Sequence, residues 1–230
     1  PQGSAVCEGT SKTLSVTASG SAPLSYQWTL DGGAISGATL SQYTVSSMAA
    51  GNVGSYVCRV TNMCNFADTT PTSLSLNTTP VLTGPTAQSI CPTVAVGNPH
   101  NAVFSVSVTC VPAPTFQWQK DGLPLTDGGN ISGATTSTLT VSGVVAGDAG
   151  SYSCVATNVC GSDTEAALLT VRAPTVIGTD PVTQTTCPGA THPVTLSVAA
   201  TGSGALSYQW NLDGNPITGA TSSSYSIASP

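Results

Sequence analysis

Eight cysteines carry most of the chemical potential of this chain. Zinc sites favour close pairs such as Cys-x2-Cys. The closest pairs here are Cys58 with Cys64 and Cys154 with Cys160, and each pair is separated by five residues. Because the cysteines recur at matched places along the chain, they favour a disulfide framework made in an oxidising compartment. We therefore expect disulfides, and neither a metal nor another cofactor.

The histidines and acidic residues are the other groups that could support catalysis or bind an ion. His100 and His192 each adjoin a proline, with no acid and nucleophile motif nearby. Catalysis needs a nucleophile with a base, or paired carboxylates at matched spacing. The sequence offers neither, so we expect no enzymatic activity. The acidic residues also lack the alternating spacing of a calcium loop; the candidates are Asp121, Asp127, Asp148, Asp163 and Glu165.

The composition of the chain argues against nucleic acid as a partner and against a membrane span. Lys and Arg total 4, Asp and Glu total 10, and the formal net charge is -6. Nucleic-acid binding depends on cationic side chains that neutralise phosphates, so we expect no such partner. Polar residues interrupt every apolar run before it reaches the ~20 residues of a membrane helix. We therefore expect no membrane span.

An internal repeat sets the domain organisation. The motif Tyr-Gln-Trp at 26–28 recurs as Phe-Gln-Trp at 116–118 and again as Tyr-Gln-Trp at 208–210. Each copy is followed by Asp-Gly and then by a variant of Ile-Ser-Gly-Ala-Thr. A repeat of about 90 residues indicates tandem units of one fold. The units that we expect span residues 1–79, 80–173 and 174–230.

The pattern within each unit predicts strands. Leu14, Val16 and Ala18 alternate with small polar residues, which is typical of a half-buried strand. Asp-Gly and Gly-Gly pairs between the runs supply tight turns. We therefore expect an all-β protein of tandem antiparallel β-sandwiches. The third sandwich should be incomplete, because its sequence stops before the Gly-x-Tyr-x-Cys segment that the other units have at 54–58 and 150–154.

The tryptophan, followed about 30 residues later by Gly-x-Tyr-x-Cys and then a Thr-Asn turn, resembles immunoglobulin-like domains of the intermediate type. The run SYQW…DG…ISGAT resembles the immunoglobulin-like repeats of large secreted bacterial surface proteins. The resemblance implies that the repeated aromatic residues lie in the sandwich cores instead of forming sugar-stacking platforms. These residues are Trp28, Trp118, Trp210, Tyr56 and Tyr152.

The cysteines depart from the pattern of that family. Its second strand normally carries an inter-sheet cysteine, but this chain has valine there, at Val16, Val106 and Val198. Cys58 should therefore be a buried free thiol against Trp28. The family fold places the start of the first strand near the turn between the last two strands, which implies different bridges. We expect Cys7–Cys64 and Cys91–Cys160, leave Cys110 and Cys154 unassigned, and expect the partner of Cys187 beyond residue 230.

Four further residues are candidates for contact or modification. Met63 and Phe66 flank Cys64, and we expect them to pack against a preceding domain; recognition of a ligand or a neighbouring chain is the alternative. Asn77 and Asn130 begin the glycosylation pattern Asn-x-Ser/Thr.

These features favour a noncatalytic structural role. We expect a segment of a longer extracellular or cell-surface repeat protein, such as a surface stalk, filament or adhesin shaft. Short joints that contain Pro80 and Pro174 should hold the units end to end. Its partners would be neighbouring repeats or other copies in an assembly. The alternative is a carbohydrate-binding or adhesive recognition module, whose partners would include glycans.

Overall fold

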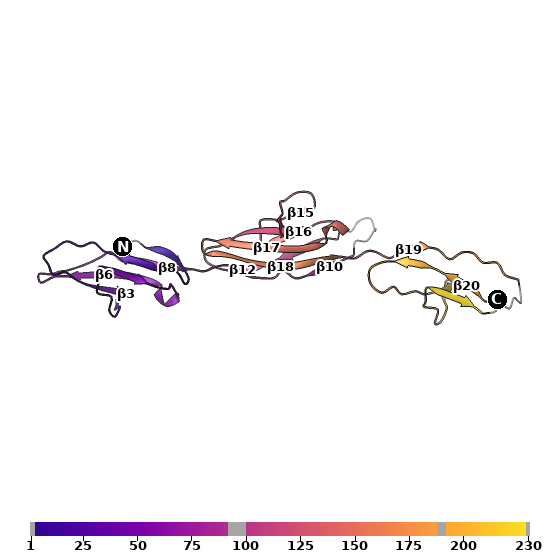
Figure 1. Ribbon diagram of the computed structural model, residues 1–230, viewed down its shortest axis with the longest axis horizontal. Coiled ribbons are helices and arrows are strands. Elements are labelled where there is room, and N and C mark those ends of the chain that lie inside the picture. The colour runs from indigo at the N-terminus through magenta and orange to yellow at the C-terminus, as the bar shows by residue number, and fades with distance from the viewer. Residues whose placement is uncertain (1–2, 92–99, 188–191, 229–230) are drawn as a thin grey trace.

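A computed structural model describes residues 3–91, 100–187 and 192–228. These residues form three β-sheet domains that follow one another end to end, with the chain passing once from each to the next (Figure 1). The all-β fold expected from the sequence is confirmed. Nowhere in the described ranges is there a helix long and apolar enough to cross a membrane.

The first domain contains two sheets. The larger has the strand order β1-β8-β6-β3-β4, with β7 paired to β6, and the smaller pairs β2 with β5. Strand β1 runs parallel to β8, whereas the other pairs are antiparallel. The elements are β1 (Ser4–Cys7), β2 (Lys12–Ser15), β3 (Ser25–Leu30), β4 (Gly33–Ala34), β5 (Gln42–Val45), the 3₁₀ turn η1 (Ala50–Asn52), β6 (Gly54–Thr61), β7 (Phe66–Asp68) and β8 (Thr72–Asn77).

The second domain repeats this plan and adds an N-terminal strand. Its larger sheet has the order β10-β18-β17-β13-β14, a second sheet has the order β11-β16-β15, and β9 pairs with β12. Strand β10 runs parallel to β18. The elements are β9 (Val81–Thr83), β10 (Gln88–Ile90), β11 (Ala102–Ser105), β12 (Ser107–Thr109), β13 (Thr115–Lys120), β14 (Leu123–Pro124), β15 (Ile131–Ser132), β16 (Thr138–Val141), the 3₁₀ turn η2 (Ala146–Asp148), β17 (Gly150–Asn158) and β18 (Gly161–Val171).

The repeated aromatic residues form the centre of both cores. Trp28 and Trp118 are fully buried, and so are Tyr56 and Tyr152. Each indole N–H donates to a backbone carbonyl across the sandwich, at 3.0 Å in the first domain and 2.8 Å in the second. Each tyrosine hydroxyl donates at 2.8 Å to the carbonyl four residues before it. Buried polar groups are therefore satisfied by the same bonds in both domains.

The Asp-Gly motif forms the turn after the tryptophan strand. Asp31 and Asp121 have positive φ angles of 47° and 51°, in the left-handed region that aspartate tolerates better than most residues. The Asp31 carboxylate accepts a hydrogen bond from the amide of Ser55 at 2.8 Å. The carboxylate of Asp121 accepts one from Ser151 at 2.9 Å. Each aspartate thus holds the turn by a hydrogen bond to the start of the strand that carries the core tyrosine, β6 or β17.

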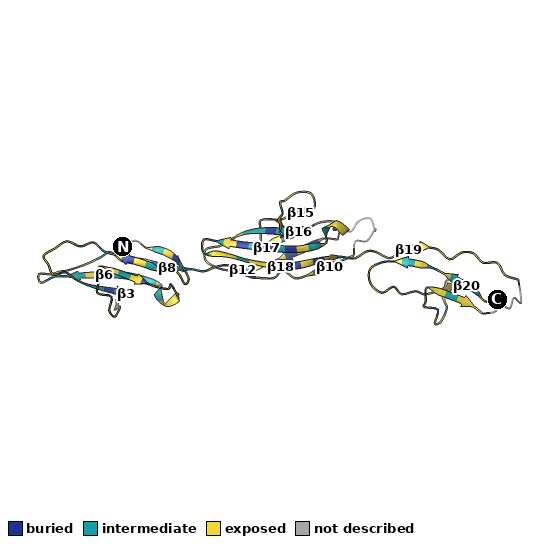
Figure 2. Ribbon diagram, in the orientation of Figure 1, coloured by how far each residue is buried: buried dark blue, intermediate teal, exposed yellow. Residues whose placement is uncertain are grey.

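The third domain is less completely paired. The residues described there contain no counterpart of β17 or β18, and residues 205–210 consequently form no strand. Figure 2 shows its strands coloured mainly as intermediate or exposed, in contrast to the dark blue segments of the first two domains. Its elements are β19 (Val176–Thr179), β20 (Val194–Ser197), β21 (Ala199–Thr201), β22 (Asn211–Leu212), β23 (Asn215–Pro216) and β24 (Ser224–Ile227).

Trp210 is therefore only half-buried, unlike its two counterparts. Its indole N–H still donates to the Ser222 carbonyl at 2.9 Å. One side of the ring faces a largely apolar cavity of about 310 Å³, which Val198 and Leu206 also line. The core position expected for Trp210 is thus formed on one side only, because the described residues of the third domain include no counterpart of β17 to cover the other.

Candidate functional site

The joint between the first two domains holds the disulfide that the structure contains. Cys7 is bonded to Cys160, with the two Cα atoms 5.5 Å apart. The expected pairs Cys7–Cys64 and Cys91–Cys160 are therefore wrong. Cys64 and Cys91 are unbridged and exposed. The bridge joins the end of β1 in the first domain to the β17–β18 turn of the second.

The direction of β1 explains this outcome. Cys7 is the last residue of β1, and the parallel register places it opposite Asn77, the last residue of β8. It therefore lies at the end of the domain from which the chain leaves. Cys64 belongs to the β6–β7 turn, which lies at the opposite end because β6 runs antiparallel to β8. The turn within reach of Cys7 is consequently that of the next domain.

Hydrogen bonds fasten the linker to the second domain beside the bridge. The Thr78 amide donates to the Val111 carbonyl at 2.8 Å, and the Val111 amide donates to the Thr78 hydroxyl at 3.0 Å. The Asn158 side-chain amide donates to the Thr78 carbonyl at 2.9 Å. Pro80 and Leu82 are buried just beyond. The joint is thus covalently bridged, hydrogen-bonded and nearly without slack.

Asn158 also sets the shape of the turn that carries the bridging cysteine. Its side-chain oxygen accepts the Cys160 amide at 2.9 Å. Asn158, Thr78 and Val111 were not among the site residues expected from the sequence. The repeated Thr-Asn pair at 61–62 and 157–158 was the available signal for the asparagine. Thr78 and Val111 lie outside any repeated motif, so no comparable signal marked them.

The second joint has a similar backbone arrangement. The Ala173 amide donates to the Ser203 hydroxyl at 2.8 Å, and the Ser203 amide donates to the Ala173 carbonyl at 3.1 Å. Cys91 follows β10, which runs parallel to β18 as β1 does to β8. Cys187 is also exposed and unbridged. Its expected partner beyond residue 230 stays a prediction.

Two further thiols lie in the cores. Cys58 and Cys154 are fully buried and unbridged, each directly across the sheet from the tryptophan of its own domain. Burial raises the pKa of the Cys58 thiol and raises the pKa of Cys154 to about 11. The buried free thiol expected at Cys58 is confirmed. Cys110 is half-buried, and its thiol donates to the Pro112 carbonyl at 3.3 Å.

Alkylation should separate these two kinds of thiol. In native buffer at pH 8, we expect iodoacetamide to modify Cys64 and Cys91 and to leave Cys58 and Cys154 intact. Alkylation requires an accessible thiolate, and the core thiols are both buried and protonated at that pH. Peptide mass spectrometry measures the modified fractions, and a denatured sample serves as the control in which all four react. Modification of Cys154 in the folded chain at the rate of Cys64 would contradict this assignment.

Met63 and Phe66 lie exposed at the free end of the first domain, which is the end opposite the bridged joint. Met63 is 87% exposed and Phe66 is 56% exposed. The Arg59 guanidinium lies 4.1 Å from the centre of the Phe66 ring. Arg59 also donates two 2.8 Å hydrogen bonds to Asp68, which lower the pKa of that carboxyl. The packing expected for Met63 and Phe66 needs a domain ahead of this end.

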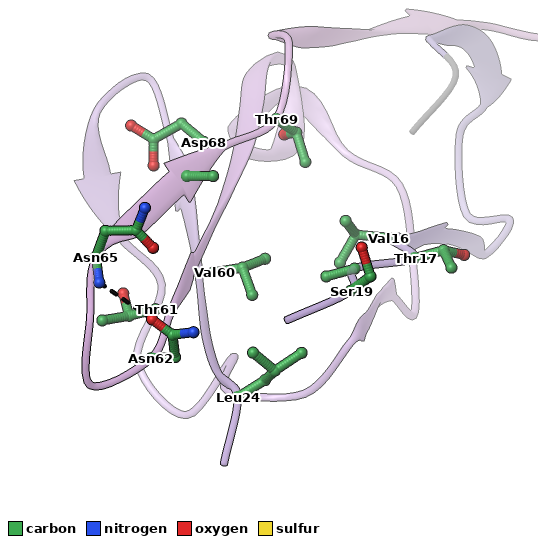
Figure 3. A pocket seen from close by; sticks show the side chains of 12 residues that line it. Val16, Thr17, Ser19, Leu24, Val60, Thr61, Asn62, Asn65, Asp68 and Thr69 are labelled. Atoms are coloured by element: carbon green, nitrogen blue, oxygen red, sulfur yellow. Dashed lines mark hydrogen bonds between the residues drawn. The ribbon is translucent and has the colours of Figure 1, made fainter. Parts of the chain in front are cut away.

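A cavity of about 300 Å³ opens near these residues (Figure 3). Val16, Leu24 and Val60 line it together with the polar side chains of the β6–β7 turn. The Asn62 amide donates to the Asn65 carbonyl at 3.0 Å and closes that turn. The cavity is therefore apolar at its centre and polar along one rim.

Several of the remaining candidates have structural roles. The Asp163 carboxylate accepts the Leu82 amide at 2.8 Å, and Asp148 accepts the Val145 amide at 2.8 Å. The Asn130 side-chain nitrogen donates to Asp148 at 3.1 Å, so the atom that a glycan would modify is already engaged. Asn77 is half-buried at the first joint. Across the described part of the chain, no three His, Cys, Asp or Glu side chains gather as a metal site would require.

Three comparisons with known proteins agree with this architecture. Residues 85–171 match the Immunoglobulin I-set domain. The chain is 30% identical over 183 residues to the human Peroxidasin homolog, covering 76% of this chain and 12% of that protein. It is 32% identical over 164 residues to rat Roundabout homolog 1, covering 71% and 9%. It is 30% identical over 174 residues to the mouse Basement membrane-specific heparan sulfate proteoglycan core protein, covering 75% and 4%.

The structural comparison covers the whole chain. The I-band fragment I67-I69 from titin superposes with a TM-score of 0.66 at 18% identity, covering 100% of this chain and 86% of that one. The chain spans 12% or less of the length of each of these three sequence relatives. Those relatives are animal proteins, so the bacterial side of the resemblance is not supported. The chain is a tandem of immunoglobulin-like β-sandwich domains, and its middle domain matches the I-set type.

Proposed function

We propose that this chain is a noncatalytic structural segment of an extracellular repeat protein, acting as a surface stalk, filament or adhesin shaft. The bridged joint is the observation that carries the proposal. A disulfide between consecutive domains, beside three linker hydrogen bonds, restricts the bending of one domain against the next. Restricted bending suits a spacer that must hold its two ends at a constant distance.

The protein is extracellular or at the cell surface. Disulfides persist in oxidising compartments and are rare in the cytosol, and one relative is named as a basement membrane proteoglycan core protein. The low charge content is also compatible with a spacer, because the few charged side chains serve the fold more than a binding surface. Several of the few carboxylates bind backbone amides of the fold, as Asp31, Asp121 and Asp163 do.

Small-angle scattering on the oxidised chain tests the spacer role. We expect an elongated particle whose maximum dimension corresponds to three domains in line, because the joints leave almost no slack. A compact, folded-back particle would contradict the proposal.

A glycan array tests the alternative role as a recognition module. Glycan binding that is lost in Met63→Ser with Phe66→Ser would favour the recognition module over the spacer.

A further inference from the structure

The free end of the first domain has the same turn that carries the bridge in the second. The Cys64 amide donates to the Asn62 side-chain oxygen at 3.0 Å, as the Cys160 amide does to Asn158 at 2.9 Å. Cys160 is bonded to Cys7, whereas Cys64 is exposed and unbridged. The two turns therefore hold their cysteines alike and differ in whether another domain reaches them.

The cavity beside Cys64 supplies an independent observation. In the second domain, the equivalent place is occupied by β9, whose Leu82 is buried and pairs with Val108 of β12. Val108 is partly buried and packs against the core cluster that contains Leu82. In the first domain, the counterpart of Val108 is Ala18, which lines the cavity with Val16. An extended strand with one apolar residue would fill this space as Leu82 fills its own.

A polar contact points to the same occupant. Asn158 donates to two carbonyls, those of Pro112 at 3.1 Å and of the linker residue Thr78 at 2.9 Å. Asn62 donates to the Ser21 carbonyl at 3.3 Å, within its own domain. Among the described residues, the Asn62 side-chain nitrogen has no second acceptor to match the Thr78 carbonyl at Asn158. The turn, the cavity and the amide thus each correspond to a part of the occupied joint.

We propose that this end of the first domain is a docking site for another immunoglobulin-like domain of the same repeat type, sealed by a disulfide to Cys64. The incoming domain provides a cysteine at the position of Cys7, and its linker strand fills the cavity. The inference deepens the proposed spacer function and rests on it.

The bridge forms by thiol–disulfide exchange with a small disulfide such as oxidised glutathione. The incoming thiolate attacks one glutathione sulfur and releases the first glutathione thiolate. The Cys64 thiolate then attacks the protein sulfur of this mixed disulfide and releases the second. Two protein thiols are oxidised and one glutathione disulfide is reduced to two glutathiones, which take up the two protons.

A four-domain chain provides the test. Residues 1–84 are repeated directly ahead of Pro1, because Pro1 and Pro85 stand six residues before the matched cysteines Cys7 and Cys91. The added copy carries Glu8→Gln, so that its Cys7 peptide differs in mass from the resident one. After oxidation with glutathione, we expect peptide mapping to link the added Cys7 to the resident Cys64. Alkylation of the resident Cys64 should be lost.

Two variants of the four-domain chain control the result. Cys64→Ser in the resident domain should leave the added Cys7 open to alkylation. Leu82→Ser in the added copy should lower the bridged fraction, because the cavity is then filled by a polar side chain. The resident Cys7–Cys160 link reports correct folding in every sample. An added Cys7 that is free, or that is bonded to the Cys64 of its own domain, would overturn the inference while that resident link is intact.

Scattering from the same four-domain chain separates the two proposals. An elongated particle in which the resident Cys64 stays free overturns the docking site and supports the spacer. A compact particle overturns the spacer role on which the docking site rests. An elongated particle with the new bridge supports both.

Discussion

We expect Trp118→Ala to lower the free energy of unfolding of the second domain by about 3–5 kcal/mol, the usual cost of removing a large buried aromatic side chain. Trp118 is fully buried, its ring centre lies 6.2 Å from that of Phe104, and its indole N–H bonds the Thr136 carbonyl. The substitution opens a cavity and removes the donor from a buried carbonyl. Hydrogen exchange of the β17 amides measures the loss in the full chain.

Trp210→Ala is the matched control for this substitution. Trp210 has the same motif and the same indole hydrogen bond, but it is half-buried beside an open cavity. Less apolar surface returns to water when its ring is removed, so the loss measured in the third domain should be clearly smaller. Equal losses at the two positions would show that the burial of Trp118 does not set the stability of its domain.

The second large effect concerns the joint. We expect Cys160→Ser to reduce the free energy of unfolding of the first two domains together by up to about 5 kcal/mol, because the bridge closes a loop with a sequence separation of 153. The linker bonds of Thr78 remain, each contributing about 0.5–1.5 kcal/mol. They tie the linker to the second domain, whereas the end of β1 then stays paired only with β8 of the first domain.

Chemical denaturation measures the stability change, and distances between spin labels in the two domains measure the bending. We expect the distance distribution to broaden in Cys160→Ser and in reduced wild-type chain. Cys64→Ser serves as the control, since Cys64 is exposed and outside the bridge. If Cys160→Ser kept the narrow distribution of the oxidised chain, the linker bonds alone would be sufficient to hold the joint.

Residues that act within one domain could be predicted from the sequence. Trp118 and Tyr152 recur with their turns at fixed spacing, and such spacing determines which side chains share a core. Asp121 was expected in a tight turn because aspartate and glycine tolerate positive φ. The incomplete third sandwich was also expected from the sequence, because residues 174–230 contain no copy of the Gly-x-Tyr-x-Cys segment, and the half-burial of Trp210 agrees with it.

The disulfide could not be predicted in the same way. The repeat shows that Cys7 and Cys160 stand at positions that recur between units, but it does not show which unit supplies the partner. That choice depends on the parallel pairing of β1 with β8, which takes Cys7 to the exit of its domain. Thr78 and Val111 were missed for the same reason, because their bonds exist only where two domains meet.

The Cys7–Cys160 bond also determines how the chain bears tension. A pull applied to the two ends enters through β1, crosses from sulfur to sulfur and leaves along β18. The residues between the two cysteines, a separation of 153, lie outside this load path. At about 3.3–3.6 Å for each extended residue, roughly 500 Å of contour length stays stored while the bond is intact. After reduction of this bond, the same pull would act on the folded sheets themselves, and their unfolding would release this length.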